Sequence, residues 1–298
     1  MTYRILHTTR YSYSQPVTLC HNEAHLRPRS LARQRCIDSH LAVQPAPALL
    51  HERTDFFGNA VTYFAVQESH DMLVVTASSR VDLEAASPID CDASLPWDMV
   101  GQRLAQEVRL EVLEARHFVL ASPFVGPSAD LAAFAQPSFS AGRPLLTAVH
   151  DLNRRIHREF VYDPNFSSIA TPLSEVLTLR RGVCQDFAHL AIGCLRSLGL
   201  PARYVSGYLQ SVPPVGQPRL VGADRSHAWF AVFDPDRGWV DFDPTNDQMV
   251  TDQHVTTAWG RDYSDVTPLK GVVFGGGAHT LEVAVDIERE GDGLVSDQ

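Results

Sequence analysis

Cys184 and Cys194 lie in one segment, RRGVCQDFAHLAIGCLRSLGLP (residues 180–201), but their surroundings differ. Apolar residues recur at helical spacing after Cys184, which predicts a helix that begins at this cysteine and ends at Gly199. The partial positive charge of a helix N-terminus favours a thiolate, and its exposed N–H groups could hold a developing oxyanion. Cys184 is therefore a candidate nucleophile, whereas Cys194 is expected to fill the core.

A nucleophilic thiol needs a histidine as general base and a third group that orients the histidine. His227 opens the strand-like segment HAWFAVF after a loop, where its side chain can face a cleft. In GWVDFDPTN, Asp241 and Asp243 share one strand face, so either carboxylate could reach the imidazole from a neighbouring antiparallel strand. The pattern alone leaves both aspartates open.

Four further residues are candidates for the oxyanion site or the walls of the cleft. Tyr162 could line the oxyanion site or belong to the core. Gln185 could donate to an oxyanion or be solvated, and Asp186 is expected to brace the first helical turn. Trp229 could wall a substrate groove, although a place in the core of the sheet is the simpler interpretation.

The elements that must position these residues fall into three parts and a tail. Residues 1–85 read as strands and predict an all-β domain resembling a small sandwich. Residues 86–140, interrupted by prolines, predict a connector with short helices, for instance Ala129–Ala135. Residues 141–290 contain helices followed by antiparallel strands, so the fold class is α+β, and residues 291–298 predict a mobile tail.

Composition and charge exclude several function classes. The net charge of −10 argues against nucleic acid and anionic membranes as partners, and no apolar stretch approaches the length of a membrane helix. The five scattered cysteines and the absence of a leader-like apolar segment predict a cytoplasmic protein with reduced thiols. His157, His189 and His227 fall on separate elements and no DxDxDG loop occurs, so we expect no metal and no cofactor.

The segments GVCQDFAHL, SHAWFAVF and GWVDFDPTN, in this order, closely resemble the three motifs of the transglutaminase-like superfamily. The resemblance covers roughly residues 145–250, and the β-rich start resembles the N-terminal region of bacterial members. It implies Cys184 as nucleophile, His227 as base and Asp243, rather than Asp241, as the orienting carboxylate. It also implies a papain-like core in which the cysteine helix packs on an antiparallel sheet.

The activity that this resemblance implies is thiol-dependent acyl transfer on amide or peptide bonds through a thioester on Cys184. Hydrolysis, as in a cysteine protease or amidase, and transamidation both remain open. An acyltransferase similar to the arylamine N-acetyltransferases is an alternative, although the cysteine of those enzymes lies in the first third of the chain. A non-catalytic protein-binding scaffold is the alternative outside enzymes.

Two surface segments could determine specificity or assembly. The Pro- and Gly-rich loop 211–224 either borders the entrance to the site or is an idle surface loop. The segment GRDYSDV (residues 260–266) could face the substrate or, with the β-rich domain, support a homodimer. The expected partner is a peptide or amide substrate.

Overall fold

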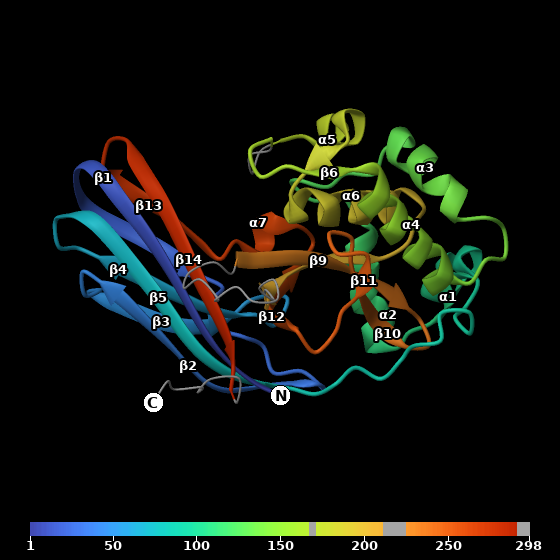
Figure 1. Cartoon of the computed structure of the whole chain (residues 1–298), viewed down its shortest axis with the longest axis horizontal. Coiled ribbons are helices and arrows are strands. Elements are labelled where there is room, and N and C mark those ends of the chain that lie inside the picture. Colours follow the sequence, from blue (N-terminus) through green and yellow to red (C-terminus); the bar gives the residue numbers. More distant parts are fainter. Residues whose placement is uncertain (167–170, 211–224, 291–298) are drawn as a thin grey trace, which may run out of the picture.

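The structure is a computed structural model of the chain, and it describes residues 1–166, 171–210 and 225–290. Figure 1 shows two regions, a sheet of long strands on one side and a mixed helical and β region on the other. No helix in these ranges is both long enough and apolar enough to span a membrane.

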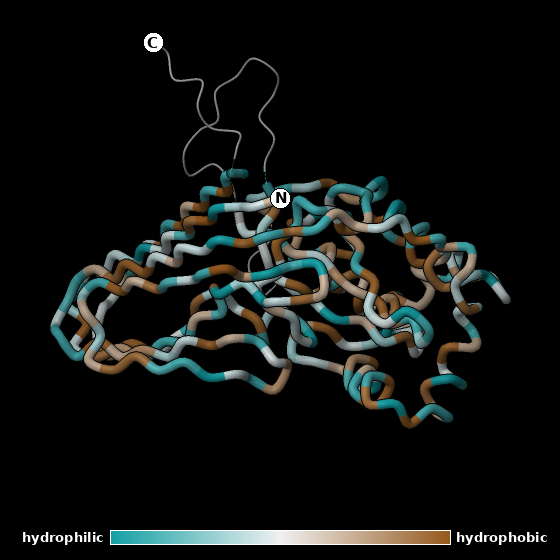
Figure 2. Tube along the Cα trace, turned by 90° about the horizontal axis from the view of Figure 1, so that it is seen from below, coloured by the Kyte–Doolittle hydropathy of each residue, from teal (hydrophilic) through white to brown (hydrophobic). Residues whose placement is uncertain are grey.

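The N-terminal region is a curled antiparallel sheet in which the long first strand pairs with four others. Its first half pairs with β5 and β14, and its second half pairs mainly with β4 and β13. Apolar residues of β5, which pairs with the first half of β1, and of β4, which pairs with the second half, meet in one core. Figure 2 shows polar and apolar residues interleaved along the strands. The strands are β1 (Thr2–Ala24), β2 (Gln34–Gln44), β3 (Leu49–Thr54), β4 (Ala60–Val66), β5 (His70–Leu83), β13 (Leu269–Gly275) and β14 (His279–Arg289).

Both ends of the chain build this sheet. We expected residues 269–289 to belong to the catalytic segment 141–290, but β13 and β14 pair with β1 instead. Strand pairing between the ends of a chain leaves no local sequence signal, because it depends on contacts far apart in the sequence. The expected mobile tail, residues 291–298, lies outside the described residues.

The connector contributes to the core of the second region. Apolar residues of its helices, such as Val112, Leu131 and Phe134, are buried in the same cluster as the helix that starts at Cys184. The elements are α1 (Trp97–Gln106), α2 (Leu110–Ala115), η1 (Arg116–Val119), α3 (Ala129–Ala135) and η2 (Gln136–Ser138). The helix expected at 129–135 is therefore confirmed.

A second antiparallel sheet, in the order β11-β10-β9-β8-β12, carries the chemistry-bearing residues, and α6 packs on β8 and β9. In Figure 1 the helices α4, α5 and α6 lie on one side of β9. The elements are α4 (Leu145–Glu159), β6 (Val161–Tyr162), α5 (Leu173–Leu179), β7 (Arg181–Gly182), α6 (Cys184–Ser197), β8 (Ala202–Leu209), β9 (Arg225–Asp234), β10 (Gly238–Asp243), β11 (Gln248–Met249), β12 (His254–Gly260) and α7 (Tyr263–Val266).

The period of two along these strands gives this catalytic sheet two different faces. Phe230, Val240 and Phe242 belong to the core that the helices cover. Trp229 and Ala231 pack with Trp239 and Trp259 on the opposite face. The sheet curls, so β12 approaches the end of β10 although β9 and β8 separate them in the hydrogen-bonding order. We call the face opposite α6 the concave face.

Two side-chain amides of the N-terminal region form hydrogen bonds with the backbone of β12. Gln34 exchanges two hydrogen bonds with the backbone of Thr256, at 2.7 and 2.8 Å. Asn59 does the same with the backbone of Trp259, at 2.8 and 2.9 Å. Both amides are buried, so each must satisfy its donors and acceptors inside the protein. The first domain therefore fixes the strand that closes the curl of the catalytic sheet.

Candidate active site

Helix α6 begins at Cys184, and a buried carboxylate braces its first turn. Asp186 Oδ2 accepts a hydrogen bond from the N–H of Val183 at 2.8 Å, as expected for this residue. A Cβ on residue 182 would lie 2.7 Å from Asp186 Cβ, so glycine is required there. Cys184 is partly exposed at the positive end of the helix. Cys194 is fully buried, and burial raises the pKa of its thiol.

His227 lies between the thiol and a buried carboxylate. Its Nε2 is 2.8 Å from Asp243 Oδ2, and the side chains are 10% and 0% exposed. The thiol of Cys184 also interacts with the imidazole and contributes to raising its pKa. Since Nε2 faces Asp243, Nδ1 is the ring nitrogen left for the sulfur. The structure thus brings together Cys184, His227 and Asp243.

The charges of these groups support one another. Burial lowers the pKa of His227, but its interactions with Asp243 and Cys184 outweigh this effect and raise the pKa to about 10. Burial raises the pKa of Asp243, but the bonds from His227 and His254 hold it well below its usual range. At neutral pH the site therefore contains an imidazolium next to an ionised carboxylate.

Asp243 accepts hydrogen bonds from more groups than the sequence predicted. Asn246 Nδ2 donates to Oδ2 at 2.6 Å, the N–H of Thr245 donates to Oδ1 at 2.9 Å, and His254 Nε2 lies 3.2 Å from Oδ2. Asn246 stands in the motif GWVDFDPTN, so its closeness to Asp243 could have been found. His254 carries no such signal, because only the curl of the sheet brings β12 to the end of β10.

The hydrogen bonds of His254 fix its tautomer. Its Nδ1 accepts a hydrogen bond from the N–H of Thr251 at 3.3 Å. Nε2 therefore carries the proton and donates a hydrogen bond to Asp243. The side chain is completely buried. His254 is therefore a second histidine on the same carboxylate, and it orients Asp243 and stabilises its charge.

The remaining predicted residues differ in their surroundings. Tyr162 is 45% exposed, which excludes the core alternative, and strand pairing places it beside Gly182. Gln185 is half-buried in the first turn of α6. Trp229 is fully buried, as the simpler interpretation held, and its Nε1 donates to Asp241 Oδ1 at 3.0 Å. Asp241 is thus the partner of Trp229.

The polar groups of residues 260–266 make contacts within the chain. Asp262 caps α7 by accepting a bond from the N–H of Ser264 at 2.9 Å, and Arg261 forms a two-point ion pair with Asp265. The N–H of Tyr263 donates to His189 Nε2 at 3.1 Å. This turn therefore docks on α6. The other predicted specificity segment, 211–224, lies outside the described residues.

His227, Asp243 and His254 are also the described residues that could hold a metal ion. Their ligand atoms lie within 4.8 Å of one another. A cation there would take up the nitrogen through which His227 binds Asp243. Metal binding would therefore compete with the hydrogen bonds that orient the imidazole.

Comparisons with known proteins agree with this geometry. Residues 3–82 match the bacterial transglutaminase-like N-terminal region, and residues 132–244 match the transglutaminase-like superfamily. Over 98% of its length the chain is 40% identical to the uncharacterized protein Rv2569c of Mycobacterium tuberculosis, of which it covers 94%. A stretch that spans 22% of the chain is 39% identical to part of a protein-glutamine gamma-glutamyltransferase of Pseudomonas aeruginosa, 10% of that protein.

The fold as a whole also occurs in a solved structure. A protein of Cytophaga hutchinsonii, described as a candidate cysteine protease, superposes with a TM-score of 0.76 at 19% identity. The match covers 99% of this chain and 92% of the other. Together with the two matched regions and the full-length relative, it shows that the chain belongs to the transglutaminase-like superfamily, among the members that carry the bacterial N-terminal region.

Proposed function

We propose that the chain transfers an acyl group from an amide or peptide bond through a thioester on Cys184. The observation that carries this proposal is the position of His227, which is hydrogen-bonded to the buried carboxylate of Asp243 and interacts electrostatically with the thiol of Cys184. Membership of the superfamily supports a thiol-dependent activity on amides in general. The candidate cysteine protease and the gamma-glutamyltransferase among its relatives both point to this chemistry.

In the acylation step the proton of the Cys184 thiol has passed to His227, which is the imidazolium, and the thiolate attacks the carbonyl carbon of the amide. A C–S bond forms and the carbonyl oxygen becomes an oxyanion, which backbone N–H groups at the start of α6 are placed to stabilise. The imidazolium of His227 then gives its proton to the amide nitrogen. The C–N bond breaks, ammonia or an amine leaves, and a thioester on Cys184 remains.

In the second step an acceptor resolves the thioester. His227, now neutral, takes a proton from water or from an amine as the acceptor attacks the thioester carbon. The sulfur leaves as a thiolate, and the imidazolium forms again. Asp243 stays ionised throughout, because His254 and Asn246 also donate to it.

The test measures the thioester and its fate. The full chain is incubated with peptides that contain glutamine, with and without a fluorescent primary amine, and quenched in acid for intact-mass analysis. We expect a mass increase equal to the acyl group on the wild type and on Cys194→Ala, and none on Cys184→Ala. Incorporation of the amine would show transamidation, whereas release of the free acid would show hydrolysis.

Two results would overturn the proposal. One is turnover of peptides by Cys184→Ala at the wild-type rate. The other is an acyl-enzyme that forms only from acetyl-CoA, which would favour the alternative acyltransferase. A peptide library without glutamine runs in parallel, because the structure does not restrict the amide to a glutamine side chain.

A further inference from the structure

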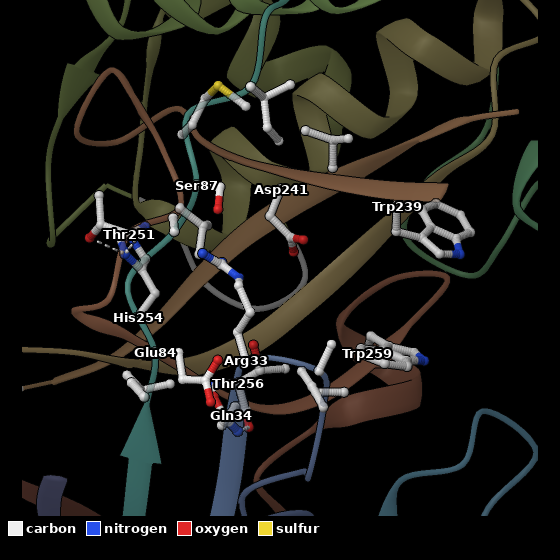
Figure 3. A pocket seen from close by; sticks show the side chains of 18 of the residues that line it. Arg33, Gln34, Glu84, Ser87, Trp239, Asp241, Thr251, His254, Thr256 and Trp259 are labelled. Carbon is white, nitrogen blue, oxygen red and sulfur yellow. Dashed lines mark hydrogen bonds between the residues drawn. The ribbon is translucent and has the colours of Figure 1, made fainter. Parts of the chain in front are cut away.

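A cavity of about 620 Å³ opens on the concave face of the catalytic sheet. Strands β8, β10 and β12 form its floor, and two segments of the N-terminal region and connector, residues 31–34 and 83–89, close its other side. Figure 3 shows side chains from both regions directed into this space. His254 lines the cavity, but Cys184 and His227 do not, so it is separate from the nucleophile. Its size suits a small organic ligand.

Arg203 on β8 lies at the floor of the cavity, and its positive charge is buried. The residue is 6% exposed, and its guanidinium lies over Trp259 at 3.8 Å and over Trp239 at 4.4 Å. Arg29 lies over Trp259 at 3.5 Å, so the two arginines must occupy opposite sides of that ring. The aromatic rings cover the faces of the Arg203 guanidinium and leave its edge, which carries the N–H groups, for acceptors.

No acceptor within the described ranges receives a hydrogen bond from Arg203. Its Nε is enclosed and unpartnered, and no ion pair of Arg203 occurs among the described residues, although the charge of Asp241 attracts the guanidinium from a greater distance. Burial lowers the pKa of Arg203 to about 9, so the group remains charged at neutral pH. A buried cation without a hydrogen-bonded counter-ion is costly, and native proteins generally satisfy such groups.

The other charged groups around the cavity limit the charge of a ligand that could accept hydrogen bonds from Arg203. Asp241 also lines the space and uses Oδ1 to accept the bond from Trp229. Arg33 and Glu84 are exposed and lie at the other side. Two arginines and two carboxylates therefore surround the cavity. An added dianion, such as phosphate, would face both carboxylates, whereas a single negative charge can bind Arg203 without that excess repulsion.

Apolar side chains fill the space between these charges. Leu31 and Leu83 come from the N-terminal region, and Met249 and Val250 follow β10. We propose that this cavity binds a monocarboxylate with an apolar body, whose carboxylate accepts hydrogen bonds from the edge of Arg203 and whose apolar part packs on these four side chains. Guanidinium and carboxylate match in planar geometry, and such charge-assisted bonds are among the strong ones.

This proposal does not depend on the proposed function, and its test does not read activity. Three tryptophans, Trp229, Trp239 and Trp259, lie on the concave face, so intrinsic fluorescence of the full chain reports binding. The probes are N-acetyl-L-leucine and N-acetyl-L-leucinamide, which have the same shape and differ in charge, together with inorganic phosphate. Isothermal titration calorimetry provides a second readout for each probe.

We expect saturable binding of N-acetyl-L-leucine, at least about tenfold weaker binding of the amide, and no competition by phosphate. Arg203→Met should abolish the preference for the acid, and Arg203→Lys should retain part of it. Ala86→Trp, which places a large side chain into the cavity from the exposed connector and leaves Arg203 in the sequence, should abolish binding of both probes. The Trp variant is read by calorimetry alone, and Cys184→Ala serves as the matched control that binds like the wild type.

Three results would overturn the inference. N-acetyl-L-leucine could show no saturable binding, or it could bind no better than its amide. Phosphate could displace it, which would identify a site for inorganic anions instead. Should Arg203→Met fail to fold, the comparison between acid and amide on the wild type and on Ala86→Trp still decides the outcome.

Discussion

The two faces of the catalytic sheet bury an arginine in different ways. On the helical side, Arg196 of α6 donates to the carbonyl oxygens of Phe118, Ala202 and Arg261 and to the hydroxyl of Ser122, at 2.6 to 2.9 Å. On the concave side, Arg203 has two aromatic rings over its faces and no acceptor among the described residues. Arg196 thus finds its hydrogen-bond acceptors within the protein, whereas Arg203 keeps N–H donors that a ligand could use.

The same difference holds for the other polar groups of the two faces. The helical face is mainly an apolar core in which Cys194 and His189 are sealed. Asp241, Asp243 and His254 all belong to the concave face or its rim. The residues of the candidate active site thus lie on one face of the sheet and at the start of α6, where Cys184 reaches the rim. The helical face supplies stability.

The largest predicted effect on rate comes from removing His227, the base at the rim of the concave face. His227→Gln should lower the rate of thioester formation by about a thousandfold or more. The variant lacks both the base that takes the proton of Cys184 and the acid that protonates the leaving amine of the substrate. Stopped-flow intact-mass measurements on the full chain give this rate. A fall of less than about tenfold would contradict the assignment of His227.

The two arginines give the next largest contrast, in stability. Arg196→Met should lower the free energy of unfolding by about 3–5 kcal/mol, because it leaves buried carbonyl groups without donors. Arg203→Met should change it by no more than about 1 kcal/mol, because the lost cation–π contacts offset the relieved burial of an unpaired charge. Urea unfolding measures both values. Equal losses would show that the two faces do not differ in this way.

His254 should have a smaller effect on rate. His254→Phe removes a donor from Asp243, and we expect kcat to fall about tenfold while KM stays nearly constant. His254→Gln, which keeps an N–H donor, should recover much of the loss. A merely structural role for His254 would make the two variants equal in kcat and would change only their thermal stability.

The last prediction concerns the pH dependence of stability. The pKa of His227 is raised from 6.5 to about 10 in the folded chain, so its contribution is complete below pH 6.5 and declines as the pH rises towards 10. The lowered pKa of Asp243 adds stability above pH 3.8 that is lost in acid. The difference in unfolding free energy between wild type and His227→Gln should therefore shrink from pH 6.5 to 10. A constant difference would argue against the charged histidine.

Sequence could predict the residues that local pattern determines. The start of α6 at Cys184 follows from helical periodicity and from Gly182, and the period of two in β10 places Asp241 and Asp243 on one face. These features depend on neighbours within a few residues.

Features that depend on distant pairing could not be predicted in this way. His254 reaches Asp243 only because the sheet curls, and β13 and β14 join β1 across almost the whole chain. The exposure of Tyr162 depends on the parallel pairing of two short strands. Arg203 reads as an ordinary polar residue in a strand, and its unsatisfied burial appears only when Trp239 and Trp259 come together around it.

The most direct test of the account is site-resolved alkylation of the folded chain with iodoacetamide at neutral pH. Mass spectrometry of digested samples separates Cys184 from Cys194, and both belong to one helix. The account predicts that Cys184 is labelled rapidly, that His227→Gln slows this labelling at least about tenfold, and that Cys194 is labelled only after unfolding. Labelling of Cys194 before Cys184, or a rate at Cys184 that ignores the loss of His227, would contradict it.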